Sequence, residues 1–367
     1  MTSIVNVGID DGHDGIKVYF GSADGVSAPV KAQIQSKAQK GLGEAVDVSA
    51  ADQADMTIMV DAIDGGEPTT FLVNGDFVTD KIDTRTDSYP YSALNLALIT
   101  QAIREVRPAL EGVTGLKIIA GLPANQYYDK VAGGKNDELI DKKIANLKTL
   151  NRAYSPADKN LTNEGRFDAV EAEIMPEGYG IAFNLMFDDD LKPTEYYDEF
   201  RQHGCVIVDI GGRTVDVVTV MPRTCKPKGS ELLSFDKGVL YLRETIATTL
   251  TERLNLKNNL NENSVDMVLK TNWFGRKNSP KGHDVTDILE EVKLKHVKEI
   301  YSSIKGALDS NEALGGIILS GGGAVLLGDM LKEVIDAGDH PGEVILPDEM
   351  VFGNAKGFWK LTWLKYK

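Results

Sequence analysis

The chain has 367 residues, of which 42% are hydrophobic and 26% charged, and its formal net charge is −15. This length allows two domains with separate cores, and the composition is typical of a soluble globular protein. Acidic residues are spread along the chain and repel phosphate backbones, which excludes direct nucleic-acid binding over a broad face.

Cysteine usage and hydropathy exclude several further classes. Cys205 lies in an apolar run and Cys225 in a loop, so we expect neither a disulfide framework nor a zinc site. The N-terminus lacks a charged region followed by an apolar core, and no run of about 18 apolar residues occurs. We therefore expect a cytoplasmic protein with no signal peptide and no membrane contact.

The first predicted element is a β-hairpin over residues 7–20, "VGIDDGHDGIKVYF". Apolar residues alternate with smaller or polar ones on both sides of the turn, which is typical of half-buried strands. The turn itself is acidic and glycine-rich. Taken alone it is typical of an exposed hairpin, and we expect Asp11 and Asp14 to be solvated turn residues.

The following elements are predicted from periodicity and from turn residues. In chain order they are two strands within 57–80, with an Asn-Gly turn after the second, a helix over 91–107, a strand over 115–123, a helix over 136–150, a strand over 167–175, a hairpin over 204–221, helices over 239–256 and 285–308, and a strand–turn–helix unit over 315–337. This mixture of hairpins and strand–helix crossovers predicts an α/β protein with mixed sheets.

The chain contains one internal repeat, formed by "VGIDDGHDGIKV" (7–18) and "VIVDIGGRTVDV" (206–217). In each copy an apolar strand ends in Asp, a Gly follows two residues later, and an apolar strand resumes. Asp10 and Lys17 are seven residues apart, as are Asp209 and Asp216. We therefore expect each copy to head its own half of the molecule.

Two such hairpins facing each other suit the phosphates of a nucleotide. Glycine lets the backbone approach closely and direct its N–H groups at phosphate oxygens. Carboxylates at the turns would repel phosphate unless Mg²⁺ lies between them, held through its water molecules. Lys17 is placed to reach a phosphate as a point charge.

A third glycine-rich turn, Gly321–Gly323, follows the strand "IILS" and opens a helix. This context is typical of a helix N-terminus that meets a nucleotide, and a tight turn is the alternative. Leu326 stands where a Rossmann fingerprint has its third glycine, and no P-loop motif occurs.

Taken in order, six segments resemble the actin/Hsp70/hexokinase superfamily of ATPases: "GIDDGHDGIK", "GLPANQYYDK", "EIMPEG", "VIVDIGGRTVDV", "GIILSGGGA" and "MVFGNAKGFW". The double-Asp loop, "LPANQYYD", "MPE" and "DIGGRTVD" are most similar to ParM-type plasmid-segregation actins. The resemblance implies an actin-like α/β fold, with two domains of related mixed β-sheets around a nucleotide cleft. Domain I would comprise 1–183 plus 346–367, and domain II 184–345. The variable subdomains would lie at about 21–90 and 257–300.

The resemblance also implies roles for individual residues. Asp10 and Asp209 would hold the water molecules of Mg²⁺, and Glu177 would orient the water that attacks the γ-phosphate. Without the resemblance, Glu177 reads as a solvent-exposed loop acid. The other implied cofactor-binding residues are Gly12, His13, Lys17, Gly211, Gly212, Arg213, Thr214 and Gly238 around the phosphates, and Gly321, Gly322 and Gly323 beside the adenosine.

Two of these positions depart from the family pattern. His13 stands where a hydroxyl is common, and we expect its ring N–H to bind the γ-phosphate, with affinity depending on pH at about 6–7. Arg213 stands where a small or hydroxyl residue is common. Its guanidinium would either bond a phosphate or pair with a surface acid.

The implied function is that of an ATPase that forms filaments. Subunits carrying ATP (possibly GTP) and Mg²⁺ would assemble with one another, and hydrolysis would destabilise the polymer. The filaments would segregate plasmid DNA through a separate DNA-binding adaptor protein, in keeping with the negative charge. The alternatives are a cell-shape or division actin and, less favoured, a small-molecule kinase of the same superfamily.

The C-terminal stretch "GFWKLTWLKYK" has Phe358, Leu361 and Leu364 at near-helical spacing. We expect a helix that docks against the first domain. A membrane-surface helix is the alternative.

Overall fold

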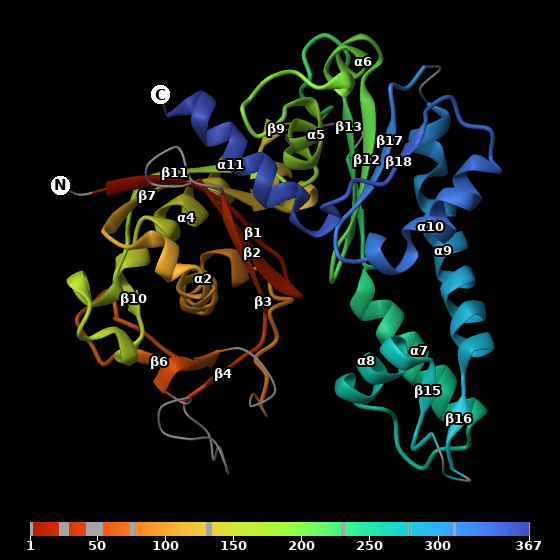
Figure 1. Cartoon of the computed structure of the whole chain (residues 1–367), viewed down its shortest axis with the longest axis horizontal. Coiled ribbons are helices and arrows are strands. Elements are labelled where there is room, and N and C mark those ends of the chain that lie inside the picture. Colours follow the sequence, from red (N-terminus) through yellow and green to blue (C-terminus); the bar gives the residue numbers. More distant parts are fainter. Residues whose placement is uncertain are drawn as a thin grey trace.

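The computed structural model describes residues 3–21, 29–41, 54–73, 78, 80–129, 134–228, 232–277, 279, 281–310 and 313–366. Two lobes lie side by side in Figure 1, each built on a five-stranded mixed sheet. The first lobe contains the sheet of the N-terminal strands, and the second lobe contains the sheet that begins at Cys205.

The sheet of the first lobe has the order β11-β7-β1-β2-β3. Its strands are β1 (Ser3–Asp11), β2 (Gly15–Phe20), β3 (Val30–Gln35), β7 (Val113–Leu122) and β11 (Asp168–Pro176). β1 and β2 form the predicted antiparallel hairpin, with Asp10 opposite Lys17. β7 pairs in parallel with β1, and β11 with β7. The alternating residues Val7 and Ile9 are fully buried in the core.

The sheet of the second lobe repeats this plan in the order β14-β13-β12-β17-β18. Its strands are β12 (Cys205–Ile210), β13 (Val215–Val220), β14 (Leu233–Phe235), β17 (Ile317–Ser320) and β18 (Val344–Ile345). β12 and β13 form an antiparallel hairpin with Asp209 opposite Asp216, and β17 pairs in parallel with β12. Each copy of the sequence repeat therefore opens one sheet, in the same register.

Helices cover both faces of each sheet. In the first lobe, α2 (Ala93–Glu105) packs on one face and α11 (Gly353–Lys365) on the other. In the second lobe, one face is covered by α5 (Tyr179–Met186) and α6 (Glu195–His203), and the other by α7 (Val239–Arg253), α9 (Thr286–Asp309) and α10 (Ala324–Asp336). The predicted long helices and strands are confirmed, with ends shifted by a few residues.

The C-terminal helix α11 returns to the first lobe, as predicted, and lies over β1 in Figure 1. Its buried face is made by Phe358 and Trp359, whereas Leu364 is exposed. A Cβ on Gly8 of β1 would come within 1.8 Å of the Ala355 carbonyl oxygen, so only glycine allows this approach. Within the described ranges, no helix is long and apolar enough to cross a bilayer.

The remaining elements are short. A four-stranded sheet beside the first lobe contains β4 (Ala38–Lys40), β5 (Thr57–Val60), β6 (Thr69–Val73) and β10 (Ala153–Tyr154). β5 and β6 are the two strands predicted within 57–80, and the Asn-Gly turn predicted after them lies outside the described residues. The others are α3 (Ala124–Tyr127), β8 (Tyr128–Asp129), β9 (Gly134–Lys135), α4 (Asp137–Leu147), α8 (Glu262–Thr271), β15 (Trp273–Phe274) and β16 (His283–Asp284). The 3-10 turns are Tyr89–Tyr91, Arg107–Leu110, Leu150–Arg152, Pro156–Asp158, Thr162–Gly165 and Met350–Phe352.

Candidate functional site

The turns of the two hairpins line a single cavity between the lobes. Its wall includes twelve of the residues named from the sequence: Asp10, Gly12, His13, Lys17, Glu177, Asp209, Gly211, Gly212, Arg213, Thr214, Gly321 and Gly322. Gly238 and Gly323 stand behind this wall. The N–H of Gly238 donates to the Arg213 carbonyl (2.9 Å) and that of Gly323 to the Ile210 carbonyl (2.8 Å). The structure thus brings most of the predicted site together, and the chemical roles stay predictions.

Glycines set the spacing of this wall. A Cβ on Gly212 would lie 2.2 Å from the Asp14 Cβ, so the second hairpin turn touches the first only because the side chain is missing. Gly321 has φ +88°, and a Cβ there would lie 2.4 Å from Asp209 Oδ1. Substitution at either position would push the two turns, or the carboxylate, out of place.

Six acidic residues line the cavity: Asp10, Asp11, Asp14, Glu177, Asp209 and Asp216. Burial and the neighbouring Asp10 and Asp216 carboxylates raise the pKa of Asp209 to about 7, although Lys17 and Asn354 oppose this. Burial, followed by the Asp10 and Asp216 carboxylates, also raises the pKa of Glu177 well above its usual value. So many acids in one cavity favour a bound cation.

The donor set fits Mg²⁺ held through water. Mg²⁺ prefers oxygen ligands and usually keeps several of its water molecules in protein sites. Among the described residues, no group of three or more His, Cys, Asp or Glu side chains is arranged to bind a metal directly. Contact with Mg²⁺ through water at Asp10 and Asp209 stays a prediction.

Lys17 extends from β2 toward these acids. Its Nζ lies 3.3 Å from Asp10 Oδ2, and both side chains are largely buried. Burial alone would lower the pKa of Lys17, but the Asp10 and Asp209 carboxylates more than offset this, and the pKa is raised. Lys17 therefore keeps its positive charge beside the cavity.

The expectation of a solvated turn residue is wrong for Asp11, whereas the Asp14 side chain is 41% exposed. Asp11 lies at the end of β1, where alternation turns it to the opposite side from Asp10 and into the lobe. Its carboxylate accepts from Lys143 Nζ of α4 (2.8 Å) and Asn95 Nδ2 of α2 (2.7 Å). Asp14 is half-exposed but pairs with Arg243 of α7 at 3.0 Å, which links the two lobes.

His13 lies at the tip of the first turn. Its Nδ1 lies 2.7 Å from the Thr84 carbonyl oxygen, and its ring lies 5.3 Å from that of Tyr89. Because a carbonyl only accepts, Nδ1 carries the proton, and Nε2 of the neutral ring has none to donate. The ring therefore donates from Nε2 only when it is protonated. Burial lowers the pKa of His13 from its ordinary value, which makes the neutral form more common.

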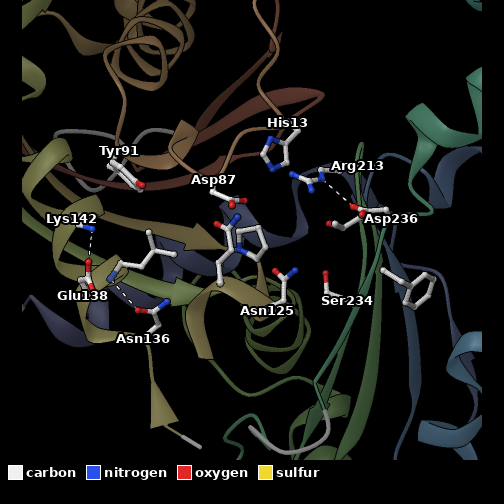
Figure 2. A pocket seen from close by; sticks show the side chains of 15 residues that line it. His13, Asp87, Tyr91, Asn125, Asn136, Glu138, Lys142, Arg213, Ser234 and Asp236 are labelled. Carbon is white, nitrogen blue, oxygen red and sulfur yellow. Dashed lines mark hydrogen bonds and ion pairs between the residues drawn. The ribbon is translucent and has the colours of Figure 1, made fainter. Parts of the chain in front are cut away.

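Arg213 pairs with Asp236 and not with the carboxylates at the ends of the two hairpins. Its Nε donates to Asp236 (3.0 Å) and its Nη1 to the Arg85 carbonyl (2.8 Å). Figure 2 shows this pair at the edge of an adjoining cavity of about 470 Å³. His13, Pro123, Arg213 and Thr214 line both cavities. Of the two predicted orientations, the structure has the outward one.

Glu177 follows the last residue of β11, and its N–H donates to the Leu122 carbonyl (2.8 Å). It is half-buried in the cavity wall, not an exposed loop acid. A Cβ on Gly121 would lie 2.9 Å from Glu177 Cγ, and the Gly121 carbonyl accepts from Lys143. Lys143, a residue with no part in the sequence-based site, thus supports the strand end beside Glu177.

Sequence reasoning missed three site residues. Asp216 is buried, and its Oδ1 has no hydrogen-bond partner among the described residues. The repeat could have identified it, because it occupies the position of Lys17. Lys143 looks like any other residue of a charged helix, and Asn354 lies in the segment "FGNAKGF" with no sign of its contact with Asp209.

Part of the chain is similar in sequence to archaeal actin homologues. Residues 207–333 match the family model of archaeal actin homologues described as MreB-like, C-terminal. An archaeal actin homologue of Thermoplasma acidophilum is 24% identical over 196 residues, or 53% of this chain and 55% of that protein. The match thus spans about half the length of this curated relative.

Two solved structures cover the whole chain. A subunit of a 15-stranded ParM filament from Clostridium botulinum superposes with a TM-score of 0.71 at 17% identity, covering 99% of this chain and 100% of that chain. ParM of Bacillus thuringiensis with ATP gives 0.64 at 15% identity, covering 100% of both chains. The chain therefore has the actin-like fold, and it resembles ParM and the archaeal actin homologues.

Proposed function

We propose that this chain binds ATP, or GTP, together with Mg²⁺ between its two lobes and hydrolyses the γ-phosphate. The observation that carries this proposal is the single cavity formed by two Asp-ended hairpins, their glycine turns and Glu177. Two structures of similar fold support it, because one is described as ParM with ATP and the other as an archaeal actin homologue in complex with ADP.

In this proposal the phosphates are bound by the backbone N–H groups of Gly12 and Gly212 and by the Thr214 hydroxyl, while Gly211, whose N–H donates to the Thr214 carbonyl (2.9 Å), shapes the second turn. Lys17 supplies a fixed positive charge. Gly321–Gly323 border the adenosine, and Gly238 supports the second phosphate turn. Arg213 and the Thr214 hydroxyl reach the phosphates only after they give up their present partners, Asp236 and Asp216. His13 keeps its bond to Thr84 at Nδ1 and donates from Nε2 when its ring is protonated.

Glu177 is assigned to orient the attacking water and to accept its proton. Asp10 and Asp209 would hold Mg²⁺ through water, and the bound cation would neutralise the charge that develops on the phosphates. Such a cation would also favour the ionised form of Glu177, whose pKa is raised by burial and then by the Asp10 and Asp216 carboxylates. The base thus becomes competent when the site is loaded.

At the level of the whole molecule we propose a homopolymer that ATP assembles and hydrolysis destabilises. Domain I is assigned to 1–183 plus 346–367 and domain II to 184–345, with the nucleotide between them. We propose plasmid DNA as the cargo, held through a basic DNA-binding adaptor protein, because the net charge of −15 disfavours direct contact.

A second candidate is a cytoskeletal actin with a cargo other than plasmid DNA. It is favoured by the sequence relatives, which are described only as archaeal actin homologues and MreB-like proteins.

Light scattering with ATP, GTP, ADP and a non-hydrolysable analogue tests the proposal. We expect assembly with triphosphate, and filaments of Glu177→Ala that persist because hydrolysis is slowed. Absence of assembly with every nucleotide would contradict the filament. Loss of the plasmid from dividing cells that lack the gene, but keep normal shape and division, would separate the two candidates.

A further inference from the structure

Asn354, in the first turn of α11, connects two parts of the cavity that come from different elements. Its side chain is 3% exposed. Its Nδ2 donates to Asp209 Oδ2 at 2.6 Å, and its Oδ1 accepts from the Gly178 N–H at 2.9 Å. The backbone N–H only donates, which fixes the amide orientation and leaves Nδ2 facing the carboxylate.

The turn that Asn354 contacts is the one that carries Glu177. Gly178 has φ +84°, and a Cβ there would lie 2.7 Å from Val218 Cγ2. Two successive N–H groups hold the turn. The Glu177 N–H donates to the Leu122 carbonyl, and the Gly178 N–H donates to Asn354 Oδ1. Displacement of Asn354 releases the second of these.

Close packing fixes Asn354 itself. A Cβ on Gly180 of α5 would lie 2.7 Å from the Asn354 carbonyl oxygen, and one on Gly357 would lie 1.8 Å from the Gly180 carbonyl oxygen. Immediately before the helix, the Met350 carbonyl accepts from Ser320 Oγ (2.8 Å) and from the Gly321 N–H (3.0 Å). The start of α11 thus contacts the Glu177 turn, the end of β17 and the Asp209 carboxylate.

We propose that Asn354 is a positioning residue that couples Asp209 to the Glu177 turn, so that cation binding at Asp209 sets the place of the catalytic carboxylate. This inference rests on the nucleotide hydrolysis proposed above. Asn354 touches neither nucleotide nor water in this scheme, and it acts only through the two groups it bridges. Partners of this kind, bonded to the ligands of a metal, typically contribute about 10- to 100-fold to metal affinity or activity.

Three variants test the coupling. Asn354→Ala removes both bonds. Asn354→Asp keeps an acceptor for the Gly178 N–H but loses the donor to Asp209. Thr362→Val is the matched control, because Thr362 is fully buried in the same helix and its hydroxyl bonds only the Trp359 carbonyl (2.6 Å), away from the cavity.

Each variant is compared with the wild type in three measurements. The first is the binding of a fluorescent ATP analogue, in EDTA and across a Mg²⁺ titration. The second is single-turnover hydrolysis at saturating ATP and Mg²⁺. The third is the melting temperature without nucleotide. For Asn354→Ala we expect about tenfold more Mg²⁺ at half-saturation and about tenfold slower hydrolysis. Affinity in EDTA should stay within about twofold. Asn354→Asp should also hydrolyse slowly, and Thr362→Val should change only the melting temperature.

The outcomes separate the two levels of proposal. A wild type that neither binds nor hydrolyses nucleotide overturns the proposed function and this inference with it. An active wild type with an unchanged Asn354→Ala overturns the inference alone. The inference also fails if Asn354→Asp hydrolyses at the wild-type rate, or if Thr362→Val reproduces the Mg²⁺ and hydrolysis effects of Asn354→Ala.

Discussion

Lys143 and Asp11 form a buried ion pair, and replacing Lys143 by Met is expected to destabilise the first lobe strongly. Their side chains are 2% and 1% exposed, and Nζ lies 2.8 Å from Asp11 Oδ1. After the substitution the Asp11 charge keeps only the bond from Asn95, and the Gly121 carbonyl loses its Lys143 donor. Breaking one partner of such a pair costs about 3–5 kcal/mol, because a buried charge is left uncompensated.

The loss of stability comes from the unpaired Asp11 carboxylate, so a second substitution that removes this charge should reverse it. Asp11→Asn keeps the size of the side chain and an acceptor for Asn95, but removes the charge. The double variant Lys143→Met/Asp11→Asn is expected to recover more than half of the loss. Lys142→Met is the matched control, since Lys142 is the preceding residue of α4 and its pair with Glu138 is exposed.

The assay is urea unfolding followed by circular dichroism, in EDTA and without nucleotide. Lys143→Met should shift the midpoint well below that of the wild type, and Lys142→Met should leave it in place. The reasoning is refuted if Lys143→Met costs less than about 1 kcal/mol, which is the range of an exposed pair. A double variant that merely adds the two single losses would also refute it.

Two further predictions concern pH. Burial lowers the pKa of His13, and the Nδ1 proton is hydrogen-bonded to the Thr84 carbonyl, so only the protonated ring has an Nε2 proton for a phosphate. ATP affinity is therefore expected to rise as the pH falls from about 7.5 to about 5.5. This rise should be absent in His13→Gln. Fluorescent-ATP titrations check this, and parallel curves for the two proteins would contradict it. For Asp209, a folded-state pKa of about 7 against 3.8 means that the folded protein retains a proton that the unfolded chain releases. The stability that this bound proton contributes is therefore lost as the pH rises from about 3.8 to about 7. Melting in EDTA should show Asp209→Asn more stable than the wild type at about pH 8, and a less stable variant would count against the charge repulsion.

The sequence was informative where local pattern decides structure. Alternating apolar residues predict the first hairpin, because the period of two places Val7 and Ile9 on the face that is buried. The repeat predicts that Asp10 and Asp209 take equivalent places. Short elements such as α8 and β4 were missed, since a helix of 10 residues and a strand of 3 residues show too little periodicity.

Side-chain partners were beyond local pattern. Asp11 was misjudged because its partners, Asn95 and Lys143, lie 84 and 132 residues away. Asn354 reaches Asp209 over 145 residues through a helix that returns to the first lobe. Such contacts depend on how β1, α4 and α11 pack together, and a motif describes only residues close in the chain.

The two hairpins share one backbone plan but differ in charge, and this difference leaves the carboxylates of the second hairpin less compensated. In the first, Lys17 stands opposite Asp10 and pairs with it. In the second, Asp216 stands opposite Asp209, so the equivalent cross-strand position adds a carboxylate where the first hairpin has an ammonium group. Burial, and then the Asp10 and Asp216 carboxylates, raise the pKa of Asp209 to about 7. A divalent ion between the lobes would therefore relieve repulsion at Asp209, where Asn354 already holds one carboxylate oxygen.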